Sequence, residues 1–339
     1  MRRPKLSLVI PVYNEEETIP ELDRRLGEFL RGVPTVGDDW EVVFIDDGSK
    51  DRSRALLGAM CERERRYKLI SFSRNFGHQA AITAGLDRAE GDWVVVLDAD
   101  LQDPPEVVAE MLQKAGEGYD VIYGVRRKRQ GETLFKRATA AAFYRLIRSM
   151  TGVAIPVDAG DFRMMSRAVV LTLRALREQH RFVRGMVAWV GFRQAAVYYD
   201  REARFAGETK YPFSKMLRFA IDGITSFSIV PLRIATWLGL LAGGVAVITG
   251  VAMFVIKVFD LGVVVPGWTT IMVAVAFGFS AQLLMTGILG EYVGRIYEEI
   301  KRRPLYVSAQ ELNFGEPRGA LPERTVVPEQ HSGDAAPRS

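Results

Sequence analysis

Two carboxylates stand directly after a strongly apolar segment of this sequence. Residues 93–97 are Trp-Val-Val-Val-Leu, and Asp98 and Asp100 follow with one alanine between them. Such a run is typical of a strand buried on both faces of a parallel sheet, whose carboxyl edge is where ligands bind. Two carboxylates at this spacing suit a hard divalent cation, Mg²⁺ or Mn²⁺, shared with phosphate oxygens. The alternative is that they only solvate the strand end and cap the helix that the prolines at 104–105 begin.

Three other turns should bring side chains to the same edge. Apolar segments at 6–12, 40–45 and 68–72 predict strands, each followed by a turn and a helical pattern. This alternation predicts a doubly wound α/β fold with a mostly parallel sheet, so the carboxyl ends of its strands meet. The residues that these turns contribute are Pro11, Tyr13, Asn14, Glu15, Asp46, Asp47, Gly48, Ser49, Arg74 and Asn75.

Ligand chemistry suggests a division of labour at this edge. Asp46 or Asp47 would accept hydrogen bonds from a nucleobase or ribose, and Arg74 would meet phosphate. Asp98 and Asp100 would face the metal and a diphosphate. An ordinary turn at residues 47–49 is the competing interpretation.

The pattern loosens after residue 130. A helix is expected near 132–150, another from Ser166, and a strand over 193–200. Asp161 lies between these elements and could orient an acceptor, contact metal or act as a weak base. The alternative is that Asp161 caps the helix that follows it.

Charge and cysteine content limit the kinds of molecule that this protein is expected to bind. The 339 residues carry a net charge of +4, which tolerates anionic partners, but no nucleic-acid-binding motif is present, so nucleic acid is not expected. The single cysteine, Cys61, excludes an internal disulfide and a multi-cysteine metal site. Residues 1–5 lead directly into the first strand without a signal-peptide pattern, so the first domain should be cytoplasmic.

Two uncharged segments are long enough to cross a membrane. Residues 234–256 and 268–290 each span about 23 residues, and a hydrocarbon core needs about 20. Basic residues flank their outer ends, whereas the connection 257–267 holds one, so the positive-inside rule places both ends in the cytoplasm. Before them, residues 212–232 form either an amphipathic interfacial helix or a plain domain helix.

The expected organisation therefore has four parts. They are a cytoplasmic catalytic domain at 1–211, an interfacial helix at 212–232, two spans within 233–294, and a cytoplasmic tail at 295–339. The tail is rich in Pro, Gly, Glu and Arg, and disorder is expected from about residue 311.

Three basic residues lie just before the first expected span. Arg201, Arg204 and Lys210 are placed where a lipid phosphate would be, and arginine suits bidentate phosphate contact. General attraction to anionic lipids would explain the same charges.

The motifs together resemble a known family. The segments that carry the resemblance are 10–15 (Ile-Pro-Val-Tyr-Asn-Glu), 46–49 (Asp-Asp-Gly-Ser), 73–77 (Ser-Arg-Asn-Phe-Gly), 98–105 (Asp-Ala-Asp-Leu-Gln-Asp-Pro-Pro) and 204–212 (Arg-Phe-Ala-Gly-Glu-Thr-Lys-Tyr-Pro). They are similar to the inverting glycosyltransferases of the nucleotide-diphospho-sugar fold, which is Rossmann-like and is also called GT-A. The closer resemblance, over about residues 5–310, is to the polyprenyl-phosphate glycosyltransferases, which include dolichol-phosphate mannose synthase, and particularly to the bactoprenol glucosyltransferase branch.

The resemblance implies a multi-pass enzyme of the plasma membrane that moves a hexose from a nucleotide sugar, UDP-glucose as the first expectation, to undecaprenyl phosphate. It implies a metal at Asp98 and Asp100 with Gln102 nearby, and basic residues near the membrane that bind the acceptor phosphate. Arg126 and Asp161 fall in stretches that match the family pattern, so both are expected at the catalytic centre, with Arg126 also near the acceptor phosphate. A homo-oligomer is implied too, with a tetramer as the first expectation.

Three other classes compete with this interpretation. A haloacid-dehalogenase-like phosphatase also places Asp-x-Asp after a strand, but near the chain start and with a different continuation. A processive polysaccharide synthase shares the first domain, yet usually has more spans and a Gln-x-x-Arg-Trp motif, which this chain lacks. A membrane scaffold without enzymatic activity would not need these residues at one sheet edge.

Overall fold

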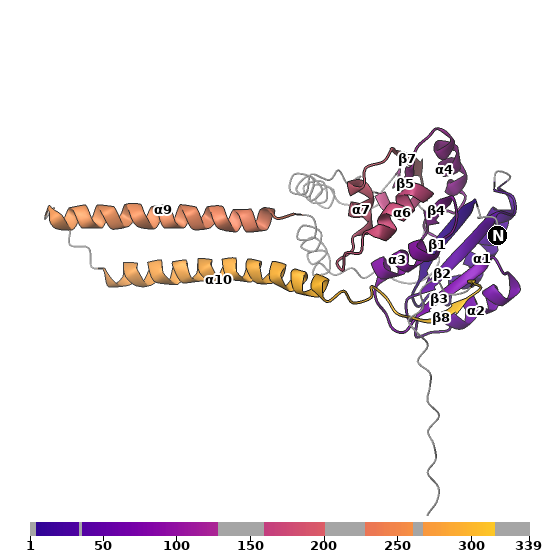
Figure 1. Cartoon of the computed structure of the whole chain (residues 1–339), viewed down its shortest axis with the longest axis horizontal. Helices are drawn as coiled ribbons and strands as arrows, with labels where there is room; N and C mark the ends of the chain where they lie inside the picture. The colour runs from indigo at the N-terminus through magenta and orange to yellow at the C-terminus, as the bar shows by residue number, and fades with distance from the viewer. Residues whose placement is uncertain (1–4, 34–35, 128–158, 201–227, 260–266, 316–339) are drawn as a thin grey trace, which may run out of the picture.

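One mixed sheet organises the part of the chain that the computed structural model describes, residues 5–33, 36–127, 159–200, 228–259 and 267–315 (Figure 1). Its strands are β1 (Leu6–Val12), β2 (Trp40–Asp46), β3 (Tyr67–Phe72), β4 (Trp93–Val96), β5 (Val121–Arg126), β6 (Ala159–Ser166), β7 (Gln194–Tyr199) and β8 (Ser308–Leu312). The spatial order is β7-β5-β6-β4-β1-β2-β3-β8, in which β6 and β8 run antiparallel to their neighbours. The predicted α/β class with a mostly parallel sheet is confirmed.

Helices cover both faces of the sheet. They are α1 (Ile19–Arg31), α2 (Ser53–Arg63), α3 (His78–Arg88), α4 (Val107–Gly116), α6 (Arg167–Ala175) and α7 (Val183–Trp189). Leu8 and Ile10 of β1 pack into the core that includes residues of α1, α2 and α4, whereas Val9 packs into the core with α3, α6 and α7. Because successive side chains of a strand point to opposite faces, the apolar runs fill both cores at once.

Two helices begin later than the sequence suggests. Glutamates favour the first turn of a helix, but those at 15–17 lie in a turn before α1, which begins at Ile19 with a proline next to it. Likewise α4 begins at Val107, after the prolines at 104–105. Both differences leave more non-helical chain at the carboxyl edge of the sheet.

Strand β6 was not expected from the sequence. It lies between β4 and β5, with Val96 of β4 opposite Arg163 and Tyr123 of β5 opposite the same residue. Since β6 runs antiparallel to β4, its first residues lie at the carboxyl edge of β4. This direction brings Asp161 alongside the strand end that carries Asp98.

Strand β8 corrects the expectation for the tail. It pairs with β3, with Leu312 opposite Leu69. Asn313 Nδ2 then donates to the carbonyls of Cys61 (2.6 Å) and Tyr67 (2.7 Å). Residues 311–313, at the approximate start of the tail that was expected to be disordered, are therefore held at the sheet edge.

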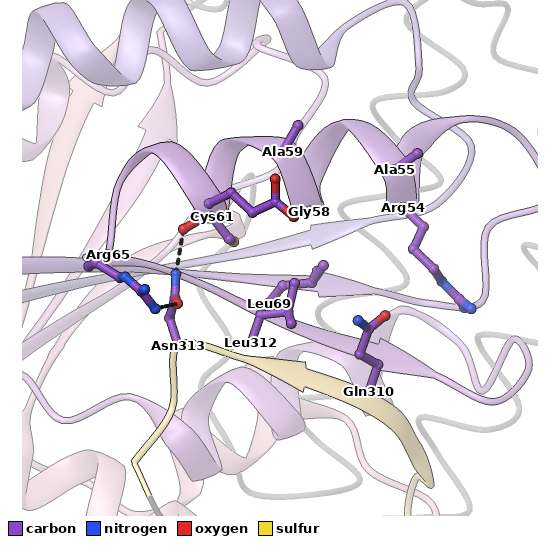
Figure 2. A pocket seen from close by; sticks show the side chains of 11 residues that line it. Arg54, Ala55, Gly58, Ala59, Cys61, Arg65, Leu69, Gln310, Leu312 and Asn313 are labelled. Carbon is purple, nitrogen blue, oxygen red and sulfur yellow. Dashed lines mark hydrogen bonds between the residues drawn. The ribbon is translucent and has the colours of Figure 1, made fainter.

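A cavity of about 620 Å³ lies between α2 and β8. Figure 2 shows the side chain of Asn313 at one end of it, bonded to the Cys61 carbonyl and to Arg65. Its lining comes from α2, β3 and β8 and includes none of the carboxylates at 98–103. The cavity is thus separate from the polar edge of the sheet that the sequence singles out.

Two long helices extend away from the sheet, α9 (Val230–Val258) and α10 (Trp268–Ile300), and they lie side by side (Figure 1). Stretches of both, Val230–Ala252 and Val273–Ile300, are long and apolar enough to cross a membrane. Trp237 and Phe277 are each 71% exposed, so these helices are not the buried core helices of a soluble domain. Residues 212–227 of the expected interfacial helix and most of the connection between the spans lie outside the described residues, and residues 230–232 belong to α9.

Candidate active site

The turns after β1 and β2 are joined by hydrogen bonds. The Asn14 backbone N–H donates to Ser49 Oγ at 3.0 Å, and Asn14 Oδ1 accepts from the Lys50 N–H at 2.8 Å. The Glu15 N–H donates to Ser53 Oγ at 2.8 Å. Asn14 has a φ of 54°, a left-handed conformation that asparagine tolerates. The structure therefore brings together the two turns that the sequence placed at one edge.

The Asp47 carboxylate links the turn after β3 to the turns after β1 and β2. Its carboxylate accepts from the Phe76 N–H (2.7 Å) and from the Gly77 N–H (3.0 Å). Burial raises the pKa of Asp47, although these two backbone bonds act in the opposite direction. Next to it, Gly48 has a φ of +68° and lies so close to the backbone of Arg74 that a Cβ would collide with it.

Asp46 is engaged within the protein. It is fully buried, and its carboxylate accepts from Arg54 Nε (2.7 Å) and from the Ser49 N–H (2.9 Å). In this structure Asp46 shapes the turn and presents no exposed oxygen to a nucleoside. The expected contact of Asp46 or Asp47 with a nucleobase or ribose stays a prediction.

Asp98 and Asp100 lie where the sequence put them, past the end of β4. The Gln102 N–H donates to Asp100 Oδ1 at 3.2 Å, and Leu101 between them has a φ of 57°. A left-handed leucine is a strained conformation that persists only where its surroundings impose it, and such positions cluster at functional sites. Burial raises the pKa of Asp98 to about 6, and the charges of neighbouring carboxylates add to this effect.

Asp161 is a buried anchor for an arginine that the sequence did not single out. Arg184 of α7 donates to it twice, from Nε to Oδ1 and from Nη2 to Oδ2, each at 2.8 Å. Burial alone would raise the pKa of Asp161, but the hydrogen bonds from Arg184 and His78 outweigh burial and hold it well below its usual range. A carboxylate held in this way is a poor general base, which favours an orienting role among those considered for Asp161.

His78 connects the two acidic groups. Its Nε2 lies 3.3 Å from Asp161 Oδ2 and 3.6 Å from Asp98 Oδ1. Burial lowers the pKa of His78, yet the hydrogen bond to Asp161 and the two negative charges raise it overall. His78 directly follows the Asn-Phe-Gly segment that carries part of the resemblance, and that position was the only hint in the sequence.

A second aspartate and arginine, Asp103 and Arg126, lie close to each other, and Asp103 is near enough to Asp98 to affect its pKa. Asp103 is fully buried, accepts a hydrogen bond from the Tyr199 hydroxyl, and has its Oδ1 at 3.7 Å from Arg126 Nη2. Gly160 leaves room for this guanidinium, because a Cβ there would lie 3.2 Å from Arg126 Nη2. Arg126 thus lies beside Asp103, a contact that was not expected, and its role at the catalytic centre stays a prediction.

The carboxylates of Asp98 and Asp100 fit a divalent cation that takes its other ligands from phosphate and water. Asp98 and Asp100 are hard oxygen donors separated by one residue, the kind of ligand that Mg²⁺ and Mn²⁺ prefer. Within the described residues no group of three or more His, Cys, Asp or Glu side chains could hold a metal by itself. Mg²⁺ in particular uses one or two carboxylates together with substrate phosphates and water, so two carboxylates suffice.

The remaining expected residues divide into three groups. Tyr13, Arg74 and Asn75 are exposed at the edge, and Arg74 packs over the Phe76 ring at 3.9 Å from its centroid. Pro11 is buried within β1. The basic residues Arg201, Arg204 and Lys210 lie outside the described residues.

Comparison with known proteins gives a consistent answer. Residues 7–174 match glycosyl transferase family 2. The uncharacterised glycosyltransferase YkcC of Bacillus subtilis is 49% identical over 90% of this chain and 94% of its own length. The SfII prophage-derived bactoprenol glucosyl transferase of Shigella flexneri is 40% identical over 89% of this chain and 97% of its own. Among solved structures, a mannosyltransferase from Pyrobaculum calidifontis, in complex with GDP-Man and Mn²⁺, is 16% identical and covers 90% of this chain and 89% of its own, with a TM-score of 0.41.

The identities to YkcC and to the bactoprenol glucosyl transferase extend over nearly the whole of each of these two relatives. The expected resemblance is confirmed, and with it the GT-A class of the α/β domain. The chain belongs to glycosyl transferase family 2 and is an enzyme that transfers sugar.

Proposed function

We propose that this enzyme transfers a hexosyl group, glucose as the first expectation, from a UDP-sugar to a polyprenyl phosphate such as undecaprenyl phosphate, with inversion at the anomeric carbon. The observation that carries the proposal is the 40% identity to a bactoprenol glucosyl transferase over 303 residues of this chain. So long a match leaves too little of the chain uncovered for the two apolar helices to lie outside it. The match therefore includes the two apolar helices as well as the α/β domain, and the relative's name refers to bactoprenol, a lipid.

The donor side rests on the polar edge of the sheet. Asp98 and Asp100, with Gln102 beside them, would hold Mg²⁺ or Mn²⁺ against the diphosphate, where the cation neutralises charge on the departing nucleoside diphosphate. The turns after β1, β2 and β3 would hold the nucleoside, with Asn14 and Arg74 among the contacts. Arg126 is also proposed to bind phosphate. Its guanidinium lies beside Asp103, which in turn accepts a hydrogen bond from the Tyr199 hydroxyl.

The chemistry needs no strong general base. A phosphate monoester has its second pKa near about 6, so the acceptor is mostly dianionic at pH 7. One of its oxygens attacks the anomeric carbon, the bond from that carbon to the diphosphate breaks, and no proton is transferred. A single displacement inverts the configuration. The low pKa of Asp161 agrees with this scheme, since a permanently ionised carboxylate orients neighbours rather than removing protons.

The membrane side explains why the acceptor would be a lipid. Two exposed apolar helices serve no purpose for a soluble acceptor, whereas a polyprenyl chain must stay in the bilayer. Arg201, Arg204 and Lys210 precede α9 in the chain and are proposed to hold the lipid phosphate. The chain would lie in the plasma membrane with its catalytic domain and both termini in the cytoplasm, and a homo-oligomer is proposed with it.

The decisive test is a transfer assay with a defined acceptor. Purified enzyme in detergent, with Mg²⁺, UDP-glucose labelled in the sugar and undecaprenyl phosphate, should give label that is extracted with the lipid. A donor panel of UDP-galactose, UDP-N-acetylhexosamine, GDP-mannose and an aminoarabinose donor would identify the sugar. Anomer-specific glycosidases applied to the product would check inversion.

Two variants, one expected to lose transfer and one expected to keep it, serve as controls for this assay. Asp100→Asn should lose transfer, and Arg177→Gln, which changes an exposed arginine paired with Asp87, should keep it. Label found in polymer without lipid acceptor would indicate a processive synthase. Donor turnover with no lipid product for any sugar would refute the proposed acceptor.

A further inference from the structure

The chain that leaves α10 returns to the sheet beside the strand that leads to Arg74 (Figure 1). Residues 301–307 connect α10 to β8, and the Val307 carbonyl accepts a hydrogen bond from the Ser73 N–H at 3.0 Å. Ser73 is the first residue after β3 and directly precedes Arg74. The backbone of this connection is thus bonded to the start of the turn that brings Arg74 to the active site.

Tyr306 in the same connection begins a row of side chains that ends at Arg74. Its ring stacks on the ring of Phe72, the last residue of β3, with the centroids 5.2 Å apart and the planes at 17°. Phe72 meets Phe76 edge to face, with centroids 5.6 Å apart. The guanidinium carbon of Arg74 lies 3.9 Å from the centroid of the Phe76 ring. These are the geometries at which aromatic pairs and cation–π pairs attract each other, so the row is a continuous set of favourable contacts.

The first two rings of the row are held firmly. The Tyr306 hydroxyl donates to Asp87 Oδ2 of α3 at 3.1 Å. Phe72 is fully buried and belongs to the core between the sheet and α3, and Phe76 and Tyr306 pack against that core. The ring of Phe76 is therefore supported from the interior, and it presents a fixed surface to Arg74.

Arg74 is an exposed side chain whose plane is set by its surroundings. Its face lies over Phe76, and its Nη1 donates to the Asn75 carbonyl at 3.0 Å. Stacking occupies the face of a guanidinium, whereas its N–H groups lie in the plane and bind phosphate from the edge. A long side chain that is already oriented loses less conformational entropy when a ligand binds.

From these contacts we propose that Tyr306 is a positioning residue of the donor site. Through Phe72 and Phe76 it holds the turn 73–77, and with it the guanidinium of Arg74, in the orientation that meets a phosphate of the nucleotide. This proposal rests on the proposed function for the nucleotide. Tyr306 lies outside residues 7–174, which match the family, so the connection after the second apolar helix contributes to the shape of the donor site.

The experiment first compares Tyr306→Leu with Tyr306→Phe. Calorimetry with UDP and Mg²⁺ measures the affinity of each full-length variant in detergent. Leucine removes the stacked ring, so UDP affinity should fall by about 2- to 10-fold, the scale of one aromatic contact. Phenylalanine keeps the ring and loses only the bond to Asp87, so it should stay within about twofold of the wild type. Wild-type affinity in a folded Tyr306→Leu enzyme would overturn the proposal.

A matched control loosens the same segment away from the aromatic row. Asn313→Gly, just past the other end of β8, removes the bonds to the carbonyls of Cys61 and Tyr67. Glycine adopts the φ of 62° at this position without strain. The Tm should fall, whereas UDP affinity should stay at the wild-type value. An equal loss of affinity in Asn313→Gly and Tyr306→Leu would show that the row has no specific role.

A double-mutant cycle tests whether Tyr306 acts through Arg74. Arg74→Gln should weaken UDP binding, and adding Tyr306→Leu to it should change the affinity by less than about twofold. Fully additive losses, or wild-type affinity in Arg74→Gln alone, would overturn the proposal. If Tyr306→Leu does not fold, Phe76→Leu replaces it, because it breaks the row one contact closer to Arg74 and should give the same loss and the same coupling.

Hydrogen exchange without nucleotide separates this proposal from the proposed function. Backbone amides of residues 73–77 should exchange about 2- to 10-fold faster in Tyr306→Leu than in the wild type or in Asn313→Gly, while those of 98–103 stay unchanged. If the wild type binds neither UDP nor GDP, the proposed donor fails, and exchange alone decides. Faster exchange at 73–77 then supports the positioning role of Tyr306, and unchanged exchange rejects it.

Discussion

Replacing Gly48 by alanine should force apart two turns of the active site. Gly48 has a φ of +68°, and a Cβ added to it would lie 2.4 Å from the carbonyl carbon of Arg74 and 2.7 Å from the backbone nitrogen of Asn75. Both are main-chain atoms, so no side-chain rotation can relieve the collision. The turn after β2 or the turn after β3 must move, and Asp47 holds these two turns together.

Gly37 provides a matched control for the size of the effect. It also has a positive φ, +57°, but an added Cβ would meet nothing within 4 Å. Gly37→Ala should therefore cost only the left-handed conformation, about 1–2 kcal/mol. Gly48→Ala adds the cost of overpacking, about 1–3 kcal/mol. Since 1 kcal/mol corresponds to about 2–4 °C for a domain of about 150–250 residues, Gly48→Ala should melt about 2–12 °C below Gly37→Ala.

Two measurements test this reasoning. The Tm of each variant, followed by intrinsic fluorescence in detergent, reports the free energy of unfolding, and calorimetry with UDP reports the state of the donor site. Gly37→Ala should keep its UDP affinity, whereas Gly48→Ala should lose affinity because Arg74 and Asn75 are displaced. Equal Tm values together with equal UDP affinities would show that the close approach of the two turns does not constrain the site.

Three further predictions concern the metal, the packing and the topology. Transfer should stop in chelator and return with Mg²⁺ or Mn²⁺. In Asp100→Asn the rate should fall by about a hundredfold or more, which corresponds to a loss of about 3 kcal/mol of charge stabilisation. Full activity in chelator would exclude a required cation. Gly85→Ala should lower the Tm by the cost of overpacking, because its Cβ would lie 2.2 Å from a β1 side chain, and an unchanged Tm would mean that α3 shifts freely. An impermeant thiol reagent applied from outside should label a cysteine introduced at Val264 but not one introduced at Ser308. The native Cys61 should not react in the folded protein, because burial raises its pKa to about 12.

The sequence predicted the central strands and the edge where they end because both follow from one pattern. Short uninterrupted apolar runs between turn signals, such as residues 93–97, are typical of buried strands, and the carboxyl ends of parallel strands lie at one edge of the sheet. Strand β6 was not predicted, because Asp161 and Arg163 interrupt the apolar run that would indicate a buried strand. Their charges are stabilised inside by pairing with one another and by contacts with Arg184, His78 and the Gly160 carbonyl, which no local pattern reveals.

The unexpected site residues share one property. His78 and Arg184 reach the site from the starts of α3 and α7, which are distant in the sequence and meet only through tertiary contacts. Asp103 was visible in the motif, but its function as a support for Arg126 depends on Tyr199 of β7. Ligand-bearing strand ends can be predicted from the sequence, whereas the side chains that orient them depend on packing between elements.

The position of β8 at the sheet edge also sets the order in which the protein can be built. Asn313 bonds to the carbonyl of Tyr67 across 246 positions of the chain, and both apolar helices lie between them. At a synthesis rate of about 5–20 residues per second, β3 must wait about 12–50 s for its edge partner, with its backbone groups open throughout. An open strand edge is a template for pairing with other chains. If α9 and α10 enter a membrane as proposed, they do so while the edge of β3 is still open to pairing with other chains, and a chain that ends before residue 308 never closes that edge.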